Sequence, residues 1–132
     1  MIEITFLQIL NALDKIGLPK ADLVIGIAQG GIVPAGLVAQ KLGCDLRIVH
    51  FNYRNRENKP VHKNPILLNK VSLPPKIRNI LIVDDVSISG KTLEAAKKLF
   101  KGRKITTVVF RGKADYMLFP EIYECVKWPW RL

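Results

Sequence analysis

The clearest indication of the fold is the segment Asn79-Ile80-Leu81-Ile82-Val83-Asp84-Asp85-Val86-Ser87-Ile88-Ser89-Gly90-Lys91-Thr92. Its continuous apolar run, 80–83, is typical of a strand that is buried on both faces, as in a parallel sheet. The polar residues 84–90 are expected to form a loop. Residues 91–100 then show the apolar spacing of a helix, which Gly102 would end. The segment predicts a strand, a polar loop and a helix in that order.

The rest of the chain shows the same alternation. Residues 23–28 form a second apolar run, Gln29-Gly30-Gly31 interrupts it, and residues 33–42 follow as a helix. Further elements are expected at 5–16 (a helix with Thr5 and Gln8 as a capping box), 46–51, 66–68, 105–110 and 122–126. Alternating strands and helices predict a single α/β domain over residues 1–132, with a mostly parallel, twisted sheet flanked by helices.

The formal net charge is +10, from 21 Lys and Arg against 11 Asp and Glu. Such a charge attracts nucleic acid, anionic membranes or phosphorylated small molecules, and composition does not choose among them. The chain contains no groove-reading or aromatic RNA-binding motif, so nucleic acid is the less favoured partner. No apolar run reaches the length of a membrane span, no signal peptide is visible, and two cysteines lack metal spacing. We therefore expect a cytoplasmic protein that does not enter membranes.

Candidate site residues follow two of the predicted strands. Asp84 and Asp85 could accept hydrogen bonds from sugar hydroxyls or help to hold a divalent metal; a polar loop start is the alternative. The next turn is rich in small polar residues and glycine: Ser87, Ser89, Gly90 and Thr92. Free amides at a helix N-terminus bind anions, although N-capping by Ser89 would give the same pattern. In parallel sheets, ligands bind beyond the carboxyl ends of the strands.

The segment 80–93 closely resembles the phosphoribosyl pyrophosphate motif of type I phosphoribosyltransferases, an apolar strand, two acids and then Thr/Ser-Gly-x-Thr. The segment 24–35 is similar to the loop with which that family contacts pyrophosphate. Trp128-Pro129-Trp130 is similar to the ending of microbial xanthine-guanine enzymes. The resemblance implies transfer of phosphoribose to a purine base (guanine, xanthine or hypoxanthine), release of pyrophosphate, a requirement for Mg²⁺ and a homodimer.

The same resemblance implies roles for particular residues. Asp84 and Asp85 would be catalytic and would hold Mg²⁺. The implied substrate-binding residues are Gln29, Gly30, Gly31, Asp84, Asp85, Val86, Ser87, Ile88, Ser89, Gly90, Lys91, Thr92, Lys113 and Trp128. The basic stretch at about 52–76 corresponds to the mobile flap of the family, in which Arg54, Arg56, Lys59 and Lys63 are candidates for contacts to pyrophosphate. Residues 111–132 would form a short C-terminal hood.

Two positions depart from the pattern of the family. Ile88 stands where the 6-oxopurine enzymes carry an Asp that manages a proton at the purine ring. Gln29 stands where purine enzymes usually have Lys or Arg. These departures leave a second hypothesis open, a sensor that binds phosphoribosyl pyrophosphate or a nucleotide without transfer. Trp128 and Trp130 could stack on a base or pack against the domain.

Overall fold

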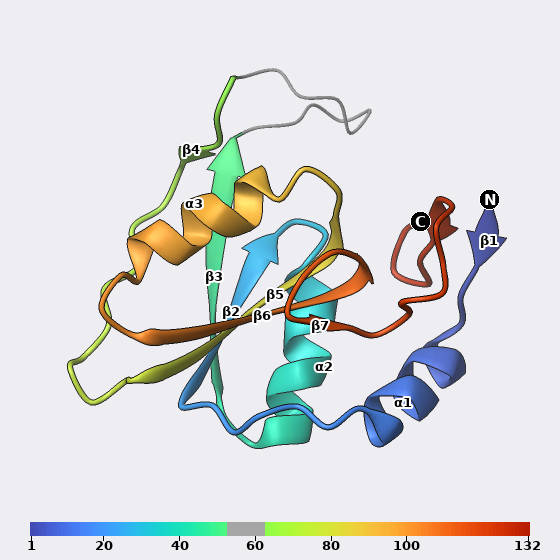
Figure 1. Ribbon diagram of the computed structural model, residues 1–132, viewed down its shortest axis with the longest axis horizontal. Coiled ribbons are helices and arrows are strands. Elements are labelled where there is room, and N and C mark those ends of the chain that lie inside the picture. The colour runs from blue at the N-terminus through green and yellow to red at the C-terminus, as the bar shows by residue number, and fades with distance from the viewer. Residues whose placement is uncertain (53–62) are drawn as a thin grey trace.

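The computed structural model describes residues 1–52 and 63–132 and contains a six-stranded sheet (Figure 1). The strand order is β4-β3-β2-β5-β6-β7, and every pair is parallel except β3 with β4. In chain order the elements are β1 (Ile2–Glu3), α1 (Phe6–Lys15), β2 (Leu23–Ala28), α2 (Ile32–Leu42), β3 (Asp45–Asn52), β4 (Ile66–Leu67), β5 (Asn79–Ser87), α3 (Lys91–Leu99), β6 (Lys104–Gly112), β7 (Tyr116–Met117) and β8 (Val126–Lys127). The predicted α/β fold is confirmed.

Both faces of the sheet are covered, which explains the continuous apolar runs. Along β5, Leu81 and Val83 belong to the core that includes residues of α1 and α2. Ile80 and Ile82 belong to the core on the other face, together with Leu93 and other residues of α3. Successive side chains of a strand point to opposite faces, so a strand covered on both sides needs no polar residue in between. Figure 1 shows α3 on one side of the sheet and α1 and α2 on the other.

The end of β5 differs from the prediction. The strand continues to Ser87, whereas the sequence analysis expected a loop from Asp84 onward. The reason is its neighbour: β6 also runs on to Gly112, and Asp84 pairs with Val109 in the parallel register. Asp84 and Asp85 therefore lie within a strand, and its backbone pairing sets the directions in which their side chains project.

The shortest elements were the hardest to predict. No sequence pattern predicted β1, which pairs in parallel with β8, or β7, which lies beside β6. A strand over 122–126 was wrong except for Val126, the first residue of β8. By contrast, the capping box of α1 is confirmed, because the Thr5 hydroxyl accepts from the Gln8 amide and the Gln8 side chain accepts from the Thr5 amide.

No described helix is suited to crossing a membrane. The longest of them, α2, has 11 residues, and a bilayer span needs about 20.

Candidate functional site

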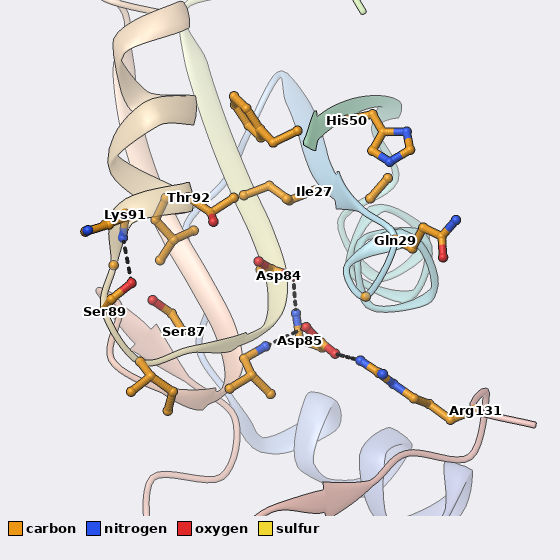
Figure 2. Close-up of a pocket in the computed structure, with 17 residues that line it drawn as sticks. Ile27, Gln29, His50, Asp84, Asp85, Ser87, Ser89, Lys91, Thr92 and Arg131 are labelled. Carbon is orange, nitrogen blue, oxygen red and sulfur yellow. Dashed lines mark hydrogen bonds and ion pairs between the residues drawn. The ribbon is translucent and has the colours of Figure 1, made fainter. Parts of the chain in front are cut away.

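A cavity of about 420 Å³ opens at the carboxyl ends of β2, β3 and β5 and beside the start of α3 (Figure 2). In the strand order, β2 and β5 are neighbours at the centre of the sheet. The chain continues from β2 to β3 toward one edge of the sheet and from β5 to β6 toward the other edge. Ligands of open parallel sheets bind where the strand order reverses in this way. The lining residues are Ile27, Ala28, Gln29, Gly30, His50, Phe51, residues 84–93 and Arg131.

The turn between β5 and α3 presents a helix N-terminus to the cavity. Gly90 is the N-cap of α3 and has a φ of 79°, which residues other than glycine rarely adopt. No side chain of the N-cap residue caps the helix. Ser89 is not the N-cap, but its hydroxyl accepts weakly from the Lys91 amide at 3.3 Å. Amides of the first helical turn have no partner inside the helix and carry the positive end of its dipole. This end of the cavity is therefore suited to a phosphate group.

The two adjacent carboxylates have different surroundings. Asp85 is buried, with its side chain 8% exposed; Oδ1 accepts from the Val86 amide at 2.8 Å and Oδ2 pairs with the Arg131 guanidinium at 3.0 Å. Asp84 is only partly buried, and its Oδ1 accepts from the Asp85 amide at 2.8 Å. Because neighbours on a strand project to opposite faces, the acids do not form a symmetric pair. Asp84 is the more accessible of the two to a ligand.

The loop after β2 uses its two glycines differently. Gly30 lines the cavity, and a Cβ added there would lie 2.5 Å from Asp85 Oδ1. Gly31 does not line the cavity, contrary to the expectation, and its amide donates to the Ile27 carbonyl at 2.7 Å. A Cβ at Gly31 would lie 2.5 Å from that same oxygen, so this glycine allows close packing of α2 against the sheet.

Two other expected contacts lie away from the cavity. Trp128 is 2% exposed and stacks on Trp130 with ring centroids 5.3 Å apart, while Phe110 meets it edge-on. Its ring is used in the core, as the packing alternative predicted, and does not line the cavity. Lys113 lines a separate hollow beside α3, although its amide donates to the Ser87 carbonyl at 3.0 Å.

The segment expected to form a basic flap, about 52–76, lies partly outside the described residues. Arg54, Arg56 and Lys59 lie there, so their expected contacts to pyrophosphate stay predictions. Lys63 is described, and its carbonyl accepts from the Lys91 ammonium at 3.4 Å. The described part also contains β4 near the expected position, and the Asn69 side chain bridges to the backbone of β3.

Sequence reasoning missed two charged or titratable residues of the lining. His50 lies near the end of β3 and lines the cavity. Because β3 pairs with β2 in parallel, the end of β3 lies at the same edge of the sheet as the end of β2, and this neighbourhood could have indicated His50. Arg131 has no local signal, because it meets Asp85 from 46 residues away.

A metal ion in this cavity would have few protein ligands among the described residues. The described part of the chain has no group of three His, Cys, Asp or Glu side chains that could hold an ion. Magnesium commonly uses only one or two protein carboxylates when substrate phosphates complete its coordination. Asp84 and Asp85 at a cavity suited to phosphate fit that arrangement.

Comparison with known proteins identifies the domain. Residues 9–130 match the family model described as "Phosphoribosyl transferase domain". The chain belongs to this family. A solved phosphoribosyltransferase of similar fold is the purine phosphoribosyltransferase from Pyrococcus horikoshii, with 25% identity and a TM-score of 0.75, covering 98% of this chain and 92% of that one.

Curated relatives of this phosphoribosyl transferase domain include both enzymes and regulators. Xanthine-guanine phosphoribosyltransferase from Cereibacter sphaeroides is 33% identical over 113 residues, which cover 81% of this chain and 64% of that protein. Transcriptional regulator GfcR 2 from Methanosarcina barkeri is 40% identical over 83 residues, which cover 63% of this chain and 39% of that protein. The chain spans about half the length of the curated relatives that it matches.

Proposed function

We propose that the chain binds phosphoribosyl pyrophosphate and transfers its phosphoribosyl group to a purine base, guanine, xanthine or hypoxanthine, with Mg²⁺. The observation that carries this proposal is the uncapped N-terminus of α3, which opens into the same cavity as Asp84 and Gly30. One cavity thus combines a site for phosphate, a site for hydroxyl groups and a glycine loop at the sheet edge.

Each part of the ligand has a suitable partner in this cavity. The turn 87–92 would hold the 5-phosphate through its backbone amides and hydroxyls. Asp84 would accept hydrogen bonds from the ribose hydroxyls, because its carboxylate is the less buried of the two. The loop at Gln29 and Gly30 would face the pyrophosphate, since it lies across the cavity from α3 (Figure 2).

The transfer breaks the bond between C1 of the ribose and a pyrophosphate oxygen and forms a bond from C1 to a ring nitrogen of the base. That nitrogen loses its proton to water or to the released pyrophosphate. Positive charge develops at C1 as the leaving group departs. A fixed carboxylate at Asp84 would stabilise that charge without reorganisation. Magnesium bound with the pyrophosphate would neutralise part of the leaving group's charge, and Asp84 and Asp85 are the described carboxylates able to hold it.

The first test is calorimetric titration with phosphoribosyl pyrophosphate and Mg²⁺, followed by release of pyrophosphate with hypoxanthine, guanine, xanthine, adenine and uracil. Asp84→Asn should weaken binding about tenfold or more, as expected when a charged hydrogen-bond partner is lost. Glu94→Gln is the matched control, because Glu94 lies on the exposed side of α3 and pairs with Lys97. No binding at millimolar ligand would refute the proposal.

A second candidate is a sensor that binds phosphoribosyl pyrophosphate or a nucleotide without transfer. The side chain of Ile88 lines the cavity at 65% exposure, where it offers neither a proton acceptor nor a hydrogen bond. The regulators among the relatives agree with this reading. Binding without turnover of any base would select the sensor, and turnover gained by Ile88→Asp would locate the missing step at this position.

A further inference from the structure

The positive charge around the cavity is unevenly placed. Among the described residues of the lining, the Lys and Arg side chains are Lys91 and Arg131. Figure 2 shows them on opposite sides of the cavity. Lys91 stands at the start of α3, and its ammonium contacts the Lys63 carbonyl at 3.4 Å. On the far side, the loop Ala28-Gln29-Gly30-Gly31 has no charged side chain. Arg131 is therefore the cation that the described structure offers at that side.

The Arg131 guanidinium is held in place but still accessible. Its Nη2 donates to Asp85 Oδ2 at 3.0 Å, and its side chain is 53% exposed. Its backbone amide donates to the carbonyl of Trp128, whose ring is buried in the core. A guanidinium has five N–H groups, so one contact to Asp85 leaves others for a ligand. Asp85 thus orients the Arg131 guanidinium and leaves N–H groups available to bind a ligand.

Gly30 brings the glycine loop against the same group. A Cβ at Gly30 would lie 2.5 to 2.6 Å from the carboxylate atoms of Asp85, which in turn contacts Arg131. The loop, Asp85 and Arg131 are therefore neighbours in space at one end of the cavity. A planar guanidinium binds phosphate oxygens in pairs and stays charged at all physiological pH values. These are the properties that a pyrophosphate subsite beside a neutral Gln29 requires.

We propose that Arg131 is a substrate-binding residue that contacts the pyrophosphate group, supplying the positive charge that Gln29 does not provide. This inference rests on the proposed function, because it assigns the pyrophosphate end of the same cavity. Asp85 is then a positioning residue, which holds the guanidinium toward the ligand.

The test compares two ligands, pyrophosphate and ribose 5-phosphate, titrated calorimetrically into the full chain at fixed Mg²⁺. Arg131→Ala should weaken pyrophosphate binding by about tenfold to a hundredfold, as expected for loss of a charge-assisted contact. Ribose 5-phosphate should bind within about threefold of the unchanged protein, because its phosphate belongs to the turn 87–92. Arg131→Lys keeps the charge but loses the paired geometry, and should lie between Arg131→Ala and the unchanged protein.

Arg47→Ala is the matched control, since Arg47 is exposed, lines neither described hollow and carries the same charge. It should leave both affinities unchanged. Equal losses for both ligands in Arg131→Ala and Arg131→Lys would show a purely structural tether and overturn the inference. Undiminished pyrophosphate binding in Arg131→Ala would overturn it while leaving the proposed function intact. If ribose 5-phosphate and phosphoribosyl pyrophosphate both fail to bind the unchanged chain, the proposed function fails, and the inference, which assigns one end of the same cavity, fails with it.

Discussion

Replacing Gly30 by alanine should disrupt the end of the cavity that Asp85 lines. The added Cβ would lie 2.5 Å from Asp85 Oδ1 and 2.6 Å from both Cγ and Oδ2, and ordinary contact begins at 3.4 Å. The carboxylate would have to move by about 0.9 Å to restore that contact. This movement disturbs the bonds from Asp85 to Val86 and to Arg131. We expect the free energy of unfolding to fall by about 1–3 kcal/mol, as in overpacked sites.

The functional effect should be larger than the effect on stability. A misplacement near 1 Å can cost about a hundredfold in rate, so turnover should fall by about that factor and affinity for phosphoribosyl pyrophosphate about tenfold. Urea unfolding and calorimetric titration measure the two effects. Gly36→Ala in α2 is the control, because no atom lies within 4 Å of its added Cβ, and it should gain about 0.5–1 kcal/mol. Equal stability and equal affinity for Gly30→Ala and Gly36→Ala would contradict the expected clash with Asp85.

Three further predictions concern the frame around the cavity. Gly31→Ala should cost about 3 kcal/mol in urea unfolding, more than Gly30→Ala, because its Cβ would meet backbone oxygens of Ile27 and Val83 that cannot rotate away; equal costs would contradict this. Trp128→Ala should cost about 3–5 kcal/mol as a buried truncation, with affinities for guanosine monophosphate and ribose 5-phosphate both unchanged at a temperature where the variant is folded; a loss of affinity for guanosine monophosphate alone would instead support base stacking. Hydrogen bonds from the Asn79 and Arg78 amides lower the pKa of Asp22 below 3.8, so its stabilisation is present above pH 3.8 and lost as the pH falls through the lower folded value. Asp22→Asn should therefore lower Tm at pH 7, and thermal melts should show the gap to the unchanged protein closing in acid; a constant gap would contradict the assignment.

The main elements were predictable because the sheet is covered on both faces. Runs such as 23–28 and 80–83 have no polar interruption, which is typical of a strand that is buried on both faces. Strands of two residues, such as β7, are too short to show any periodicity. The extension of β5 through Asp84 depends on how far β6 runs beside it, which is a property of the pair and not of the segment itself.

The site was predictable where its chemistry is local. The pair Ser89-Gly90 predicts a turn before a helix. The positive φ of Gly90 is the physical reason for a glycine at this position. The different environments of Asp84 and Asp85 were not predictable, because the strand geometry and Arg131 together create them. Trp128 shows the opposite limit: an aromatic residue near a candidate site has the same composition signal whether it packs in the core or stacks on a ligand.

The ribbon of β1 and β8 has a practical consequence for experiments. The Ile2 amide donates to the Cys125 carbonyl at 3.1 Å and the Ile4 amide to the Lys127 carbonyl at 3.3 Å, so residues 2–4 anchor the segment that leads to Arg131. An affinity tag fused ahead of Met1 would load this anchor directly. We therefore expect the affinity for phosphoribosyl pyrophosphate to differ between tagged and cleaved protein, and assays should use the cleaved form.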